Sequence, residues 1–144
     1  MSKIQIQRAN VIAMMEAAEI AYPFECCGLL IGQIKNESNY FVNEFKPSPN
    51  VARGNHKTNF EIDHKIRLKI MKDLRDGPNK VIGHYHSHPN QTSEPSTKDL
   101  DMAFEPELVW LIIAVENGQA NLPRAYILNK SGKSFQEIEL NEFK

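Results

Sequence analysis

Residues 81–89, VIGHYHSHP, and the tetrad Ser96-Thr97-Lys98-Asp99 carry the pattern that best predicts the fold and the chemistry of this chain. Residues 81–88 are expected to form a strand, which Pro89 ends because proline cannot donate to a strand ladder. Alternate residues of a strand point to the same face with Cα atoms roughly 6.5–7 Å apart, so His86 and His88 can converge on one cation. The pattern therefore predicts two imidazoles at a strand end that faces an open loop.

Two histidines and one carboxylate would leave a fourth tetrahedral position for water, which is the pattern of catalytic rather than structural zinc. Spacing alone does not choose the carboxylate among Glu94, Asp99, Asp101 and Glu105. The same residues have plainer interpretations. A His-x-His pair can be packed or solvated, and Ser96 followed three residues later by Asp99 is a capping box that begins a helix. The residue types leave both interpretations open.

The rest of the chain predicts alternating strands and helices around this segment. Residues 3–7 alternate like a short edge strand, and apolar residues then recur at helical spacing from Val11 to Tyr22. Apolar runs at 29–31 and 40–42 indicate an antiparallel hairpin, and residues 46–59 have the composition of a loop. The remaining expected elements are a helix over 62–74, a short helix over 96–104, a fully buried strand over 108–115, and closing strands over 124–128 and 134–140. The order is β-α-β-β-α-β-α-β-β-β.

Composition bounds the class of protein. The chain has 144 residues, of which 41% are hydrophobic, and is expected to form a single domain over residues 1–144. Its 17 basic and 18 acidic side chains nearly balance, so neither nucleic acid nor a membrane is an expected partner. Cys26 and Cys27 are adjacent, which disfavours a disulfide, and we find no signal peptide or membrane span. We therefore expect a cytoplasmic protein.

The spacing His86-Ser87-His88, seven residues, then Ser96-x-x-Asp99 resembles the motif of the JAMM metallopeptidases, also called MPN+ or Mov34/PAD-1. In that family the motif is His-Ser/Thr-His-x7-Ser-x-x-Asp with an upstream glutamate. A second segment, residues 23–32 with the sequence PFECCGLLIG, is similar to the Pro-x-Glu-x-Cys-Gly-x-Leu-x-Gly segment of small stand-alone bacterial members. The resemblance implies an α/β fold, a cytidine-deaminase-like α/β/α sandwich with a central mixed β-sheet.

The resemblance also implies a role for each matching residue. His86, His88 and Asp99 would bind one Zn²⁺ per chain, Glu25 would be the general base, and Ser96 would donate to the developing oxyanion. His84 shares the face of His86 and His88, and a three-histidine zinc site is chemically reasonable. The family usually has an apolar or aromatic residue there, so His84 is expected to be a packed neighbour of the ligands. Cys26 and Cys27 are expected to be packing residues.

The function that the resemblance implies is that of a zinc-dependent peptidase or isopeptidase. Its substrate would be an amide bond at or near the C-terminal Gly-Gly of a ubiquitin-like or sulfur-carrier protein, with the tail added as a strand to an open sheet edge. One alternative is a non-catalytic MPN-type protein-binding domain that has lost its metal, although the complete set of site residues argues against it. A DNA-repair-associated JAMM relative is another, but no basic or aromatic platform supports nucleic-acid binding. The signature of a zinc deaminase is absent.

Overall fold

The computed structural model describes all of residues 1–144 as a mixed α/β structure built on one eight-stranded sheet. The expected fold class and order of elements are confirmed, with one short additional strand, β6. The helices are α1 (Arg8–Ala21), α2 (His64–Asp73) and α3 (Thr97–Asp101). The strands are β1 (Lys3–Gln7), β2 (Cys27–Lys35), β3 (Asn39–Ser48), β4 (Lys80–Pro89), β5 (Val109–Glu116), β6 (Gln119–Ala120), β7 (Arg124–Leu128) and β8 (Phe135–Phe143).

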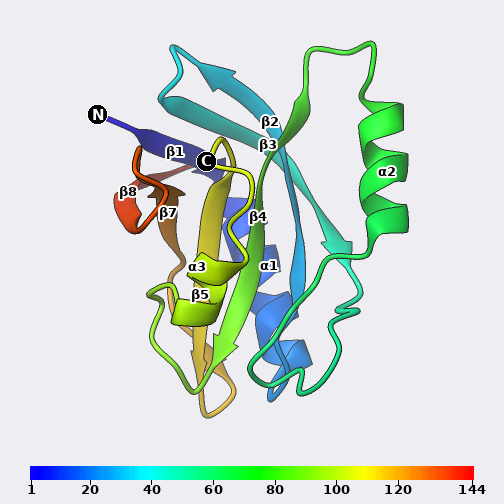
Figure 1. Cartoon of the computed structure of the whole chain (residues 1–144), viewed down its shortest axis with the longest axis vertical. Coiled ribbons are helices and arrows are strands. Elements are labelled where there is room, and N and C mark those ends of the chain that lie inside the picture. The colour runs from blue at the N-terminus through cyan, green and yellow to red at the C-terminus, as the bar shows by residue number, and fades with distance from the viewer.

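The sheet closes on itself. Its strand order is β4-β2-β3-β1-β8-β7-β5-β6, and β4 pairs with β5 as well, so that seven strands form a barrel-like ring (Figure 1). β4 is antiparallel to β2 and parallel to β5. Both edges of the strand that carries the histidines are therefore occupied by neighbouring strands, and no substrate tail can pair with it directly.

The prediction that residues 3–7 form an edge strand is wrong. β1 lies between β3 and β8 and is parallel to both. Ile4 and Ile6 are fully buried, whereas Gln5 and Gln7 are not. The alternation shows only that one face of the strand is covered. This holds for an edge strand and also for a strand inside a curled sheet, so the pattern does not distinguish the two positions.

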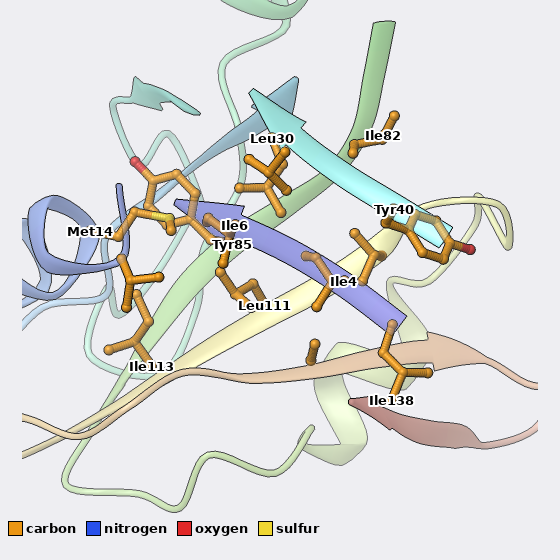
Figure 2. Packing of buried hydrophobic residues seen from close by; sticks show 14 of the residues in the cluster. Ile4, Ile6, Met14, Leu30, Tyr40, Ile82, Tyr85, Leu111, Ile113 and Ile138 are labelled. Atoms are coloured by element: carbon orange, nitrogen blue, oxygen red, sulfur yellow. The ribbon is translucent and has the colours of Figure 1, made fainter. Parts of the chain in front are cut away.

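The interior of the ring holds the main hydrophobic core, to which α1 also contributes. Figure 2 shows Ile4 and Ile6 of β1 surrounded by side chains from β2, β3, β4, β5 and β8, with Met14 of α1 at one side. Tyr85 of β4 is packed over Gly28, where a Cβ atom would lie 2.5 Å from the Tyr85 ring. This close approach explains why glycine is needed after Cys27.

The outer face of the sheet carries the other two helices. Ile70 of α2 packs on Leu29 and Ile31 of β2, and Ala103, just after α3, packs on a cluster that contains Trp110. Helices therefore cover both faces of the sheet, as expected for the α/β/α arrangement. None of the three helices has both the length and the apolar content that crossing a membrane requires.

A β-bulge decides which side chains of β4 reach the outer face. The register between β2 and β4 shifts after Leu30, which pairs with Gly83, so that Ile31 pairs with Val81 and Ile82 is the extra residue. Ile82 and Tyr85 both join the inner core, whereas His84 and His86 contact aromatic side chains of the outer face. The bulge thus lets a largely apolar strand present a row of histidines outside.

Candidate active site

Three ligand atoms converge at the C-terminal end of β4. The Nε2 atoms of His86 and His88 are 2.9 Å apart. Oδ2 of Asp99 lies 3.0 Å from Nε2 of His88 and 3.4 Å from Nε2 of His86. All three residues are buried, with exposed fractions of 0%, 2% and 5% for His86, His88 and Asp99. They form a group that can hold a metal ion.

The donor set fits zinc. Ligands at about 2.0–2.1 Å from a tetrahedral ion lie about 3.3 Å from one another. The three separations in this site, 2.9, 3.0 and 3.4 Å, bracket that spacing. Two imidazole nitrogens and one carboxylate oxygen also leave a fourth position for water, as in catalytic zinc sites.

Asp99 reaches this position because it belongs to the capping box of α3. The Asp99 N–H donates to Ser96 Oγ at 3.0 Å, and the Ser96 N–H donates to Asp99 Oδ2 at 2.8 Å. The capping interpretation and the metal-ligand interpretation therefore apply to the same residues. The other three carboxylates lie elsewhere: Glu94 faces Arg124, Glu105 pairs with Arg67, and Asp101 is exposed.

Each histidine is oriented by a neighbour. His88 Nδ1 is 2.8 Å from the carbonyl oxygen of Thr92, to which it donates when its Nε2 faces a metal. His86 stacks on Phe60, with ring centroids 4.1 Å apart and an interplanar angle of 15°. Its Nδ1 is buried without a hydrogen-bond partner. Hydrogen bonding therefore orients His88, whereas ring packing orients His86.

The electrostatics of the group suit metal binding. Burial raises the pKa of the Asp99 carboxyl, but hydrogen bonds from His86 and His88 outweigh it and hold that pKa well below its usual range. Burial lowers the pKa of His86. For His88, burial also lowers the pKa, but its bonds to Asp99 and to the Thr92 carbonyl raise it overall. Asp99 is thus an anion and His86 a neutral donor near pH 7, the forms that bind cations.

Glu25 reaches the same site from a distant part of the sequence through the register of β2 and β4. Cys27 is the partner of His86. The antiparallel pairing continues past it, because Ser87 N–H donates to the Cys26 carbonyl at 3.0 Å and Cys26 N–H donates to Ser87 Oγ at 2.9 Å. Glu25 directly precedes Cys26, just outside β2, and its carboxyl is close enough to His88 and Asp99 for their charges to shift its pKa.

The loop over residues 49–63 fixes the backbone of Glu25. The Glu25 N–H donates to the carbonyl of His56 at 2.7 Å. The side-chain amide of Asn50 donates both to the Glu25 carbonyl, at 3.1 Å, and to the Asn59 carbonyl, at 2.8 Å. Turn composition predicted a loop here but not these contacts, because hydrogen bonds to backbone carbonyls depend on no particular side chain at the acceptor residue. His56 itself is half-buried, with Nε2 2.6 Å from the Ala52 carbonyl.

Glu25 is 5% exposed. Burial raises its pKa from 4.5 to about 8, and the Asp99 carboxylate adds to this, whereas His88 and Lys98 oppose it. A raised carboxyl pKa beside a group of candidate metal ligands is typical of a catalytic acid or base.

The remaining candidates, His84, Cys26 and Cys27, pack against neighbouring residues. His84 contacts Phe60 and Trp110, at ring-centroid distances of 5.9 and 4.2 Å, and is not part of the group of three. Burial lowers its pKa to about 3. Cys26 and Cys27 are free thiols, and burial raises the pKa of Cys27 to about 12, so neither forms a disulfide or has the character of a nucleophile.

Sequence comparison places the chain in a family. The model of Prok-JAB, prokaryotic homologs of the JAB domain, matches residues 7–127. The chain belongs to this family. The match includes β1's last residue, both metal-site segments and Glu25, so the prokaryotic JAB domain accounts for most of the ring described above.

Relatives of this JAB protein include named enzymes. A CysO-cysteine peptidase of Mycobacterium tuberculosis is 26% identical over 124 residues, which are 85% of this chain and 82% of the relative. A desampylase of Pyrococcus furiosus is 30% identical over 109 residues, which are 76% of this chain and 70% of the relative.

Solved structures share the fold. A protein from Desulfitobacterium hafniense superposes with a TM-score of 0.83 at 27% identity, covering 98% of this chain and 93% of that one. A JAB1/MPN domain protein from Archaeoglobus fulgidus has a TM-score of 0.63 at 24% identity, covering 97% of this chain and 99% of that one. The closed mixed sheet of this JAB protein is therefore shared with other solved proteins.

Proposed function

We propose that this chain is a zinc-dependent peptidase or isopeptidase that hydrolyses an amide bond at or near the C-terminal Gly-Gly of a ubiquitin-like or sulfur-carrier protein. The observation that carries the proposal is the convergence of His86, His88 and Asp99, with the buried Glu25 carboxyl close enough to His88 and Asp99 for their charges to shift its pKa. The relatives support the substrate class, because they are named CysO-cysteine peptidase and desampylase.

In this proposal His86, His88 and Asp99 would hold the zinc ion. Bound there, zinc would act as a Lewis acid that polarises the scissile carbonyl and acidifies the attacking water. Asp99 is held in place by the Ser96 N–H and His88 by the Thr92 carbonyl, so both side chains already point at the place where the ion would bind.

Glu25 would transfer the proton. Its carboxylate would take a proton from the attacking water and pass it to the nitrogen of the leaving amine. A carboxyl whose pKa lies near 8 can both hold and release a proton close to neutral pH. Its backbone is fixed on both sides, by the His56 carbonyl and by the Asn50 side chain, so the carboxyl group has a defined starting position.

Ser96 would stabilise the oxyanion. Its Oγ accepts the hydrogen bond from the Asp99 N–H at 3.0 Å, which leaves the hydroxyl hydrogen available to donate. A donor aimed at the developing negative charge on the carbonyl oxygen stabilises the transition state more than the ground state. The same side chain can therefore cap α3 and take part in the reaction.

The test is hydrolysis of a defined conjugate. The zinc-loaded protein is incubated with a carrier protein that ends in Gly-Gly followed by one further amino acid, and the products are read by intact mass. We expect loss of that residue, no reaction after removal of the metal with EDTA, and recovery when zinc is restored. Asp101→Asn, an exposed change on α3, is the matched control and should react normally.

Two results would contradict the proposal. If Gly-Gly-tailed conjugates stay intact while unrelated peptides are cut rapidly, the substrate class is wrong. If nothing is cut by the zinc-loaded protein, the chain is better explained as a non-catalytic binding domain.

A further inference from the structure

A cavity of about 310 Å³ lies on the outer face of the sheet, between α2, the segment after α3 and the strands β4 and β5. It shares Phe60, Glu61 and Met102 with a second cavity, of about 260 Å³, that is lined by Asp99. The two cavities therefore lie next to each other on the outer face, and the second one reaches the candidate metal site.

The walls of the 310 Å³ cavity are mainly apolar. They include Phe60, Leu108 and Trp110 at the sheet, and Met102 and Phe104 from the segment after α3. Met102 is 46% exposed and Phe104 77% exposed, so part of this apolar surface is not covered by the protein itself. An uncovered apolar cavity next to reactive groups is typical of a ligand site.

The charged groups of the cavity do not favour an anionic ligand. Arg67 is already paired with Glu105 at 2.5 Å, and both side chains are partly buried. His84 also lies on the cavity wall, and its Nδ1 atom is buried without a hydrogen-bond partner, so His84 takes part in no ion pair there. Glu61 also lines the cavity and its carboxylate has no ion-pair partner, so an anionic ligand group would lose water without gaining a free opposite charge, whereas an apolar group would cover exposed apolar surface.

The cavity lies close to the candidate metal site along β4. His84 lines it and precedes His86 by two positions on the same strand, a separation of roughly 6.5–7 Å between Cα atoms. In the function proposed above, the residues before the scissile bond are glycines, which have no side chain to fill such a space. The nearest residue with a side chain is the one that follows the bond.

We propose, resting on that function, that this cavity is the subsite for the residue released from the Gly-Gly tail, and that it selects a mainly apolar side chain, such as that of leucine or methionine, over glycine and over an acidic side chain. Phe60, Met102 and Trp110 would contact this side chain. Of these three residues, Met102 is the most exposed, and a substitution can shorten its side chain. Met102 is therefore assigned as a specificity-determining residue.

The test measures binding directly, so it does not depend on turnover. Trp110 is the only tryptophan of the chain and lines the cavity, so its fluorescence reports occupancy. The zinc-loaded Glu25→Gln protein is titrated with acetyl-Gly-Gly-X tripeptides in which X is leucine, methionine, glycine or aspartate. We expect at least about tenfold tighter binding for leucine and methionine than for glycine and aspartate.

Variants then locate the binding. Met102→Ala should weaken binding of the leucine peptide about threefold to tenfold and leave the weak binding of the glycine peptide unchanged. Leu122→Ala is the matched control, because Leu122 is 63% exposed and does not line the cavity. It should bind like the parent protein.

The outcomes separate this proposal from the function on which it rests. If the tripeptides bind as expected but no carrier conjugate is cut, the subsite is supported and the substrate class is wrong. If conjugates are cut but all four tripeptides bind equally, the function is supported and the subsite is overturned. The subsite is also overturned if peptides of the form acetyl-X-Gly-Gly show this selectivity and acetyl-Gly-Gly-X peptides do not. The cavity would then bind the tail residue that precedes the two glycines.

Discussion

The hydroxyl of Ser87 accepts a hydrogen bond from the backbone N–H of Cys26 at 2.9 Å, while the N–H of Ser87 donates to the Cys26 carbonyl at 3.0 Å. Ser87 lies between the two candidate ligand histidines, and Cys26 follows Glu25. This pair of bonds therefore sets the position of Glu25 relative to His86 and His88. Ser87 is fully buried, so no water can replace the hydroxyl without rearrangement.

Ser87→Ala should separate metal binding from turnover. It removes the acceptor for the Cys26 N–H, and an unsatisfied buried donor costs about 1–3 kcal/mol in the free energy of unfolding. We expect zinc content to be retained and turnover to fall roughly tenfold, because Glu25 is less well positioned. Urea denaturation, elemental analysis and the conjugate assay measure the three quantities.

Ser87→Thr is the control for this change, since threonine keeps the hydroxyl acceptor. It should restore most of the turnover. If Ser87→Ala reacts as fast as the parent protein, the bond to Cys26 has no part in positioning Glu25.

Metal binding should depend on His88 but not on His84. We expect His88→Ala to lose most of its zinc, because an open site with three ligands needs all of them for tight binding. His84→Phe should keep one zinc per chain, since the ring of His84 packs against Phe60 and Trp110 and lies outside the group of three. Elemental analysis of folded protein, verified by circular dichroism, gives both results.

Either of two results would revise the ligand assignment. Full zinc occupancy in His88→Ala would remove His88 from the site. A folded but metal-free His84→Phe protein would make His84 a ligand.

The stability of the metal-free protein should fall as pH rises from about 4.5 to about 8. Burial raises the pKa of Glu25 from 4.5 to about 8, so in this range the folded protein keeps a proton that the unfolded chain releases. The favourable contribution of protonated Glu25 is complete below pH 4.5 and is lost as pH rises toward the folded pKa. Glu25→Gln cannot lose this proton, so its stability relative to the parent protein should rise over the same range.

The expected gain of Glu25→Gln over the parent between pH 4.5 and 8 is on the order of 3 kcal/mol. Urea denaturation of both proteins in EDTA at pH 5, 6.5 and 8 measures it. Parallel stability curves for the two proteins would mean that Glu25 ionises in the folded state as it does in solvent.

The local elements of this fold could be predicted because each has a periodic pattern. Residues 124–128 form β7 over the predicted bounds, and the alternation of Ile4 and Ile6 gave the bounds of β1. Helix α3 is shorter than predicted, because it ends at Asp101. Pro106 lies a few residues beyond this end, and proline biases the residue before it, Glu105, away from helical geometry. Closure of the ring could not be predicted, because strand pairing between distant segments leaves no local pattern.

The candidate site divides in the same way. The two histidines could be predicted to meet because they alternate on one strand, whereas Asp99 was chosen among four nearby carboxylates only through the family motif. The buried carboxylate of Glu25 was found only through a family motif, since nothing local links it to β4. Phe60 and the carbonyls of His56 and Thr92 were missed, because they act through ring packing and backbone atoms. The family motif has Ser or Thr at the position of Ser87. This hydroxyl was the one sequence signal available for the hydrogen bond between Ser87 and Cys26.

Zinc content and turnover of Glu25→Gln, measured on the same preparation, test the central claim most directly. Glutamine keeps the shape of the side chain but cannot take a proton from water. We predict full zinc occupancy and a turnover of the Gly-Gly-tailed conjugate that is roughly 10²–10⁴-fold lower than that of the parent protein. Near-normal turnover by the zinc-replete variant would contradict the assignment of Glu25 as the general base, and loss of zinc would instead make Glu25 a ligand.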